Sequence, residues 1–310
     1  MRKFSPEKRL GLAVMLALLV SPISILARMV KDQTGRSVNV PDHPHRLVSL
    51  APSVTESLYA LGLGDRLVGD TDYCDYPPQA KTLEHVGGTQ NPSLEKIVAL
   101  KPDLVLGTDE ANRREAADQL EHLGIPLYGV TAHTVDGTIQ SVEDLGHVLE
   151  WDQPTEKIVA SLRARVAAVD RQVQGKPRLK VHFVVQYRPL IAAGRGTFIS
   201  DVIRRAGGAS VSDDMTTEWP HMGLEGVLGR APDVILMPRT ETFTPNLDDF
   251  KRLPGWRDLA AVKNGHIYFV SESIMHPSPR LIDALEEVAD ILHPGERPRT
   301  AARQVGNHQN

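Results

Sequence analysis

The sequence has few of the residues on which several classes of site depend. Cys74 is the only cysteine among 310 residues. One cysteine excludes an intrachain disulfide, a thiolate zinc cluster and an iron–sulfur centre built by this chain alone. Aromatic residues make up 5% of the chain, and the net charge is -4 with no dense run of lysine and arginine. The chain therefore lacks the basic field with which a general nucleic-acid binder displaces counterions.

Long hydrophobic runs are also scarce. The one at Leu10 to Val20 follows a basic segment and ends before Pro22. A membrane anchor would need about 20 apolar residues, so this shorter run favours a secretory signal peptide. We expect residues 1–27 to be that peptide, with cleavage after Ala27, and the mature protein to be soluble and periplasmic. No cysteine lies at the end of the run, which disfavours a lipid-anchored protein.

Motifs for catalysis are missing as well. Gly194 and Gly196 lack the third glycine of a dinucleotide fingerprint, and the chain has neither a P-loop nor a Gly-x-Ser-x-Gly nucleophile elbow. Its 12 histidines form no His-x-x-x-His pair. We therefore predict no catalytic residue and no protein-held metal, and we interpret Cys74 as an inert small residue.

Short apolar segments alternate with helical patterns through the first half of the chain. Strands are expected at 46–50, 66–69, 104–106 and 125–130. Helices are expected after Pro52, after Ser93 and over residues 112–122. This alternation predicts an α/β lobe with a mainly parallel sheet, over residues 45–150.

A longer helix is expected at residues 155–174. Its apolar residues recur every three or four positions and so share one face: Val159, Leu162, Val166, Val169 and Val173. Thr155 is the expected N-cap, and Gly175 and Pro177 end the helix. Such a helix would be about 30 Å long, because each residue adds 1.5 Å. An ordinary surface helix is one interpretation, but strand-like sequence restarts at 179–186, which favours a connector between two lobes.

The second half of the chain repeats part of the first. The segment from Leu94 to Leu106, with its helix, Pro-Asp turn and buried strand, recurs without a gap from Leu224 to Leu236. The repeat predicts a second lobe over residues 178–293, followed by a polar, disordered tail at 294–310. The expected fold class is therefore α/β: two similar α/β lobes joined by one long backbone helix, with the ligand cleft between the lobes.

Aromatic and polar residues follow several of the expected strands. Open parallel sheets bind ligands at the carboxyl ends of their strands, so these residues predict a binding cleft. Simpler interpretations exist, since Trp219 could fill a lobe edge and Arg280 could pair with Asp283. The candidate ligand-binding residues are Tyr73, Thr89, Gln90, Tyr187, Arg188, Trp219 and Arg280.

Several motifs together resemble a known family. They are RLVSLAPS at 46–53, LGLGDRLVG at 61–69, CDYPP at 74–78, LEKIVALKPD at 94–103, Trp219-Pro220 and PSPR at 277–280. The chain resembles the vitamin B12/iron-siderophore periplasmic-binding family over residues 45–293. These are substrate-binding proteins of ABC importers. The resemblance implies two α/β lobes on a backbone helix, a cleft that holds a bulky metal chelate, no enzymatic activity and no resident cofactor.

The cobalamin-binding branch is the most similar. Its cleft aromatics correspond to Tyr73 and Trp219, whereas two further tryptophans of that branch fall at Thr89 and Thr108. A corrinoid such as vitamin B12 is thus the expected ligand, and a ferric siderophore or haem is the alternative. The other candidate ligand-binding residues would meet polar groups around the ligand rim.

The resemblance also implies a partner, an ABC permease dimer with its ATPase. In the family, an acidic residue of each lobe docks onto arginines of the permease, and here these residues are Glu95 and Glu225. A simpler interpretation is that each acid complements the dipole of its helix. The protein is expected to be a monomer. Two rival functions remain open: an exported chelatase-like enzyme, and a receptor subunit that keeps its ligand.

Overall fold

The computed structural model describes residues 27–239 and 247–294. All but the first residue of the predicted tail and all but the last residue of the predicted signal peptide lie outside the described residues. The described residues begin with a hairpin, in which β1 (Ala27–Lys31) pairs antiparallel with β2 (Ser37–Pro41). The sequence analysis did not predict this hairpin. Arg28 Nη2 donates to the carbonyl of Val148 at 2.6 Å and thereby anchors β1. Cleavage after Ala27 would leave Arg28 as the first residue of this strand.

The first lobe contains a parallel five-stranded sheet with the strand order β5-β4-β3-β6-β7. Its strands are β3 (Leu47–Ser49), β4 (Leu67–Asp70), β5 (Glu84–His85), β6 (Leu104–Thr108) and β7 (Leu127–Val130). The helices are α2 (Pro52–Ala60), α3 (Leu94–Leu100), α4 (Arg114–His122) and α5 (Val135–Val148), with short 3-10 turns η1 (Gly64–Arg66) and η2 (Pro78–Thr82).

The second lobe is built around the parallel strand order β10-β8-β11-β12, with β9 antiparallel to β8. Its strands are β8 (Leu179–Gln186), β9 (Ile191–Ala192), β10 (Gly208–Ser210), β11 (Val234–Pro238) and β12 (Ile267–Val270). The helices are α7 (Phe198–Arg205), α8 (Leu224–Arg230), α9 (Leu247–Arg252), α10 (Ala260–Lys263) and α11 (Leu281–Leu292), and the 3-10 turns are η3 (Trp256–Asp258) and η4 (Glu272–Met275).

The sequence repeat corresponds to the same local structure in both lobes. Helices α3 and α8 each end at a residue with left-handed backbone, Lys101 and Ala231. The aspartate that follows accepts a hydrogen bond from the backbone at the neighbouring first strand. Asp103 Oδ2 accepts from Arg46 N at 2.8 Å, and Asp233 Oδ2 accepts from Lys180 N at 2.8 Å. The sequence repeat therefore corresponds to one structural unit that occurs once in each lobe.

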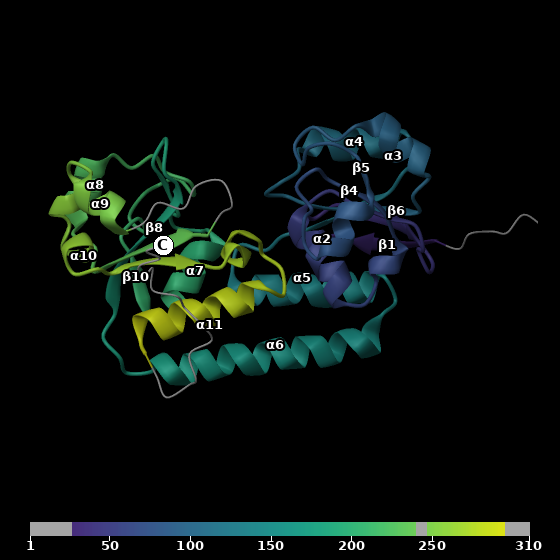
Figure 1. Cartoon of the computed structure of the whole chain (residues 1–310). Helices are drawn as coiled ribbons and strands as arrows, with labels where there is room; N and C mark the ends of the chain where they lie inside the picture. Colours follow the sequence, from purple (N-terminus) through teal and green to yellow (C-terminus); the bar gives the residue numbers. More distant parts are fainter. Residues whose placement is uncertain (1–26, 240–246, 295–310) are drawn as a thin grey trace, which may run out of the picture.

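Helix α6 (Asp152–Val173) runs beneath both lobes, alongside α5 and α11 (Figure 1). The expectation that Thr155 caps this helix was wrong, because the helix begins three residues earlier. The Thr155 hydroxyl donates to the carbonyl of Trp151 at 2.7 Å, a contact made inside the first turn. The apolar face is as predicted, with Val159, Leu162, Val166 and Val169 buried.

Ion pairs join α6 to the second lobe and the second lobe to α5, and apolar packing joins α6 to both lobes. Arg165 Nη2 lies 2.7 Å from Glu286 Oε2 of α11, and Arg205 of α7 lies 2.7 Å from both Asp136 of α5 and Asp170 of α6. One hydrophobic cluster includes buried residues of both lobes and of α6, among them Leu58, Leu145, Val166, Phe183 and Leu285. The lobes and the connecting helix therefore share one core.

Candidate functional site

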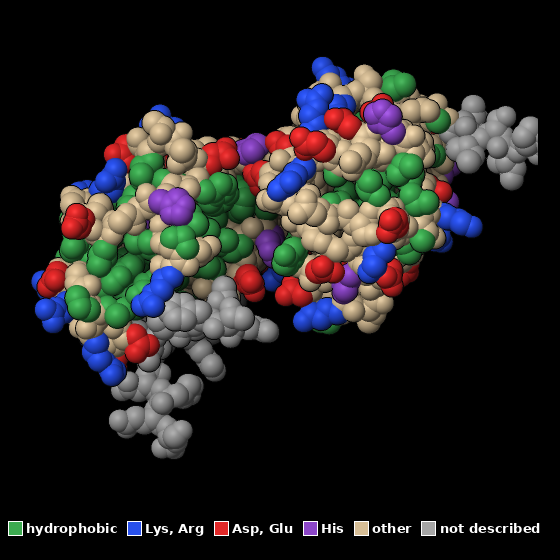
Figure 2. Space-filling view, turned by 90° about the horizontal axis from the view of Figure 1, so that it is seen from above, with side chains coloured by type: hydrophobic (Ala, Val, Ile, Leu, Met, Phe, Trp, Pro, Cys, Tyr) green, Lys and Arg blue, Asp and Glu red, His purple; other side chains and the backbone are tan. Residues whose placement is uncertain are grey.

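A hollow separates the two lobes when the molecule is seen from above (Figure 2). Hydrophobic side chains border it on the second lobe, and acidic side chains with a histidine lie along it (Figure 2). Glu218 of the second lobe raises the pKa of Glu110 of the first lobe, so these two carboxylates lie near each other between the lobes. The loops of these two residues therefore border the region between the lobes where the sequence analysis expected a cleft.

Three aromatic side chains in the loops after β4 and β10 are unusually exposed. The exposed fractions are 62% for Tyr73, 44% for Tyr76 and 41% for Trp219. Trp219 packs edge-on against the buried ring of Phe198, with the ring centres 6.3 Å apart. Large exposed apolar surfaces beside a hollow suit a flat ligand, since aromatic rings offer contact area with few rotatable bonds.

Tyr187 is placed differently from these three aromatics. Its ring is half-buried and packs against Phe250 and Trp256, with ring centres 6.1 Å and 5.8 Å away. Arg188 is exposed and its guanidinium lies 5.4 Å from the centre of the Tyr187 ring. Much of the Tyr187 side chain thus belongs to the core of the second lobe, while Arg188 is open to solvent.

Asn112 positions the loop that carries Thr89 and Gln90. Its Nδ2 donates to the carbonyls of Thr89 at 2.8 Å and Leu50 at 2.9 Å, and its Oδ1 accepts from Thr108 N at 2.7 Å. One side chain therefore connects the end of β6, the start of α2 and the Thr89 loop. Thr108 itself is buried.

An acidic cluster with one histidine lies beside the cleft. His133 Nε2 lies 3.1 Å from Asp109 Oδ2, and His133 Nδ1 lies 3.1 Å from Glu110 Oε1. Burial raises the pKa of Glu110, and Asp109 and Glu218 raise it further although His133 opposes them. Among residues 27–239 and 247–294, no three histidine, cysteine or acidic side chains are grouped as metal ligands.

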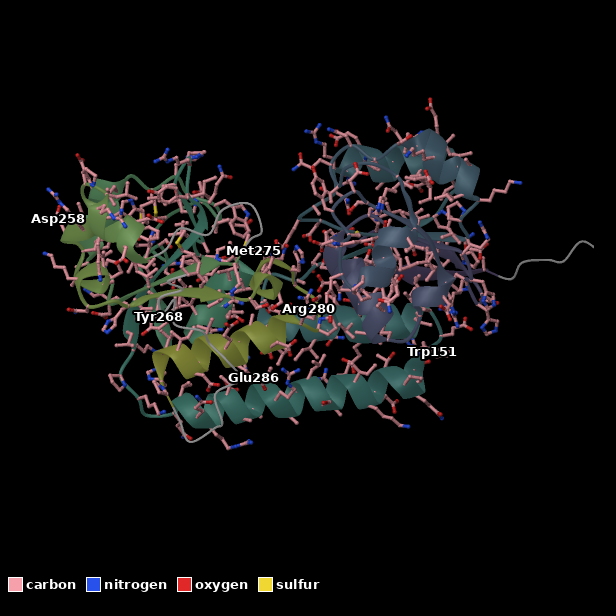
Figure 3. All side chains as sticks on the ribbon, in the orientation of Figure 1. Trp151, Asp258, Tyr268, Met275, Arg280 and Glu286 are labelled. Atoms are coloured by element: carbon pink, nitrogen blue, oxygen red, sulfur yellow. The ribbon has the colours of Figure 1, made fainter. Side chains whose placement is uncertain are left out.

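Arg280 lies between the lobes, at the beginning of α11 (Figure 3). The expected alternative pairing with Asp283 was wrong. Asp283 accepts a hydrogen bond from Arg165, whereas Arg280 Nη1 donates to Glu56 Oε1 at 3.1 Å. The Arg280 guanidinium also lies over the ring of Tyr76, with Cζ 3.5 Å from the ring centre. Arg280 is thus held by two side chains of the first lobe.

Glu56 was missed as a candidate residue. It lies in the middle of α2, where all residues from Ser53 to Leu58 are buried, and its own exposed fraction is 4%. A charged residue inside a buried helical run was the available signal, because buried carboxylates need specific partners.

Glu95 and Glu225 occupy equivalent exposed positions, each in the first turn of its helix. In α3 the Ser93 hydroxyl accepts a hydrogen bond from Lys96 N, as its place before the helix predicts. Both glutamates are therefore accessible, and each lies on the same element of its lobe.

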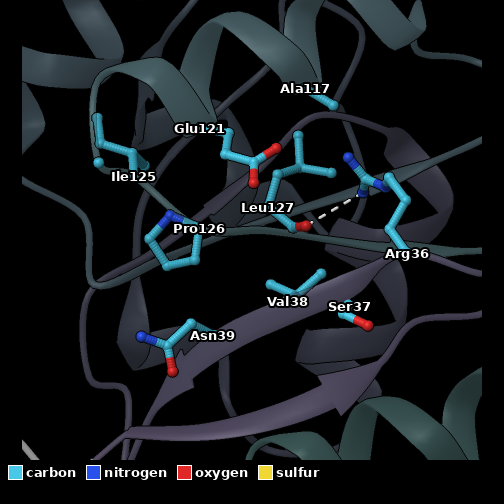
Figure 4. Close-up of a pocket in the computed structure, with 10 residues that line it drawn as sticks. Arg36, Ser37, Val38, Asn39, Ala117, Glu121, Ile125, Pro126 and Leu127 are labelled. Carbon is cyan, nitrogen blue, oxygen red and sulfur yellow. Dashed lines mark hydrogen bonds between the residues drawn. The ribbon is translucent and has the colours of Figure 1, made fainter.

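A separate hollow of about 230 Å³ lies on the flank of the first lobe (Figure 4). It is lined by residues of β2, the end of α4 and β7, and Arg36 Nη2 donates there to the carbonyl of Leu127 at 3.1 Å. None of the predicted ligand residues lines it.

A sequence profile described as periplasmic binding protein matches residues 47–273. The chain belongs to the periplasmic binding protein family. This is a family of binding proteins, not of enzymes, and its solved members have the two-lobed α/β architecture. In the described parts of the chain, no helix is long and apolar enough to cross a membrane.

Known members of the family resemble this chain over most of their length. The vitamin B12-binding protein of Vibrio campbellii is 30% identical over 247 residues, covering 79% of this chain and 88% of that protein. That of Yersinia pestis is 35% identical over 207 residues, covering 66% and 73%.

Solved structures of periplasmic binding proteins also resemble this chain. The periplasmic vitamin B12-binding protein of Vibrio cholerae matches with a TM-score of 0.74 at 30% identity, covering 81% of this chain and 98% of that chain. The periplasmic haem-binding protein of Roseiflexus matches with a TM-score of 0.73 at 27% identity, covering 80% and 98%.

Proposed function

We propose that this protein binds a corrinoid such as vitamin B12 in the periplasm and delivers it to an ABC importer. The observation that carries the proposal is the similarity to vitamin B12-binding proteins along almost their whole length. The exposed rings of Tyr73 and Trp219 support it, since a corrin ring needs flat apolar contacts. The signal peptide proposed for residues 1–27 would direct export.

The polar candidate residues would contact the polar groups at the rim of the ligand. Thr89, Gln90 and Arg188 offer a hydroxyl, an amide and a guanidinium for the amide and phosphate groups of a corrinoid. Tyr187 contributes the exposed part of a ring that is otherwise fixed by Phe250 and Trp256.

Glu95 and Glu225 are proposed to dock onto cationic side chains of the permease dimer. Two like lobes that present one carboxylate each would suit a receptor with two-fold symmetry. Charge pairs at such a rim mainly set orientation and association rate. The proposed working form is a monomer that meets the permease and its ATPase only for delivery.

The alternative ligand is haem or a ferric siderophore, because the haem-binding protein of Roseiflexus has the same fold at a similar TM-score. Thr89 and Thr108 stand where the cobalamin branch has tryptophans, so this cleft offers fewer flat contacts to a corrin.

The test is to incubate the purified mature protein with cobalamin, haem and ferric siderophores, and to record native mass spectra and visible absorption. A one-to-one cobalamin complex is expected. A complex with haem or ferric siderophore alone would support the alternative. Metal insertion into a free ligand would instead identify an exported chelatase, and binding without uptake through a reconstituted permease would identify a receptor that keeps its ligand.

A further inference from the structure

Glu56 links the two lobes through three side chains of the second lobe. Its Oε1 accepts from His276 Nδ1 at 2.9 Å and from Arg280 Nη1 at 3.1 Å, and its Oε2 accepts from Ser278 Oγ at 2.5 Å. The Glu56 side chain is 2% exposed. Moving Arg280 away would leave the buried carboxylate of Glu56 without its charged partner, which is unfavourable. The bond to Glu56 therefore holds Arg280 in one position.

The face of Arg280 that is not used by Glu56 covers an aromatic ring of the first lobe. Its Cζ lies 3.5 Å from the centre of the Tyr76 ring, well inside the range of a cation–π contact. Tyr76 follows β4 in the same loop as Tyr73, and it remains 44% exposed. Since the guanidinium occupies one face of the ring, the exposed surface belongs to the opposite face and the edge.

We propose that Tyr76 is a ligand-contacting residue, whose ring Glu56 and Arg280 hold ready to stack on the bound chelate. The proposal rests on the proposed function. A ring that is fixed from behind loses little conformational entropy on binding, so it adds affinity beyond its contact area. Tyr76 would thus extend the flat surface of Tyr73, and Arg280 would be a positioning residue, not the rim contact that the sequence analysis expected.

A double-mutant cycle separates positioning from direct contact. We would measure the Kd for cobalamin by calorimetry in the unsubstituted mature protein, Tyr76→Ala, Tyr76→Phe, Arg280→Lys and the double variant Tyr76→Ala/Arg280→Lys. Tyr76→Ala should raise Kd roughly 10- to 100-fold, the range for a large aromatic anchor. Tyr76→Phe keeps the ring and should bind as before. Arg280→Lys should weaken binding when Tyr76 is present and have no further effect when it is absent.

Arg165→Lys is the matched control. Arg165 also joins two elements through carboxylates, but its partners are Asp283 and Glu286 on α11. Its replacement should leave Kd unchanged. A second readout is fluorine NMR of 3-fluorotyrosine at position 76. Its resonance should shift on addition of cobalamin and also in the Arg280→Lys variant without ligand.

The possible failures can be told apart. Cobalamin binding with an unchanged Kd in Tyr76→Ala would overturn this inference and leave the proposed function intact. Additive losses from Tyr76→Ala and Arg280→Lys would assign Arg280 its own ligand contact and overturn its positioning role. Absence of any chelate binding by the unsubstituted protein would overturn the proposed function together with the contact of Tyr76.

Discussion

Trp219 combines an exposed face with one packed edge. Its ring meets Phe198 at 66°, and 41% of the residue is exposed. Trp219→Ala should therefore weaken corrinoid binding by about 1–3 kcal/mol and alter the free energy of unfolding by less. Calorimetric titration and urea unfolding would measure the two effects. Trp151 packs on the shared core and donates to the carbonyl of Leu61 at 2.8 Å, so Trp151→Phe should lower the free energy of unfolding and leave corrinoid affinity unchanged. Unchanged affinity in Trp219→Ala would remove this residue from the proposed site.

His182 is a buried histidine without a hydrogen-bond partner in the described structure, at the centre of β8. Burial lowers its pKa from 6.5 to about 4. The unfolded chain therefore binds an additional proton between these values, so stability falls as the pH drops from about 6.5 to 4, by up to about 3 kcal/mol. The contribution is fully present above pH 6.5.

Urea unfolding between pH 7 and pH 4.5 would test this linkage. His182→Leu removes the titrating group and should unfold with a shallower pH dependence than the unsubstituted protein. His122 is exposed on α4, and His122→Leu should leave the slope as it is. Equal slopes in the unsubstituted protein and His182→Leu would contradict the assignment.

At the scale of elements, Asn112 connects three of them through one side chain. Asn112→Ala would leave the carbonyls of Leu50 and Thr89 without their shared donor, at a cost of about 1–3 kcal/mol. The Thr89–Gln90 loop should loosen, so amide hydrogen exchange there should rise and ligand affinity should fall. Asn91→Ala is the control, because it shortens an exposed side chain in the same loop without removing those bonds. Exchange unchanged in Asn112→Ala would show that other contacts hold the loop.

Local patterns predicted many of the elements. The alternation of strands and helices, the Ser93 cap and the apolar face of α6 all follow from short-range periodicity and capping. The β1–β2 hairpin was missed because its pairing with the rest of the lobe depends on distant partners, such as Val148 for Arg28. The prediction that Thr155 caps α6 was wrong because Pro154 is compatible with the first turn of a helix, so α6 can begin before it.

The site residues were harder to predict than the elements. The proposal of a site at the loops of Tyr73 and Trp219 follows from the general position of ligand sites in parallel sheets. The roles of Glu56, Tyr76 and Arg280 depend on contacts between lobes that are far apart in sequence. No local pattern distinguishes an arginine that pairs with Asp283 from one that reaches across the molecule to Glu56.

On the scale of the whole molecule, the shared hydrophobic core predicts cooperative unfolding. Val166 of α6 packs in a cluster with buried residues of both lobes. Val166→Ala should cost about 2 kcal/mol and lower the temperature of one common transition. Scanning calorimetry and circular dichroism would measure it, with the exposed Lys157→Ala on the same helix as control. Two resolved transitions, with only one shifted, would show that the lobes unfold separately.

Delivery to the permease is also a property of the whole molecule, because it needs both lobes at once. Glu95 and Glu225 are exposed at equivalent positions of α3 and α8. Glu95→Ala with Glu225→Ala should leave ligand affinity intact but slow docking and uptake, since rim charges act mainly on association. Raised salt should slow the unsubstituted protein in the same way, because ions screen exposed charges. Uptake into vesicles that contain the reconstituted permease and ATPase would measure the effect.

Glu115 gives this last experiment its control. It is an exposed acid in the first turn of α4, so it has the same relation to a helix dipole as Glu95 and Glu225. If the two glutamates served only their helices, Glu115→Ala would change stability by less than about 1 kcal/mol, the double variant would change it by less than about 2 kcal/mol, and neither would affect uptake. Slowed uptake in the double variant alone would assign Glu95 and Glu225 to the permease. Normal uptake in both would return them to the role of complementing their own helix dipoles.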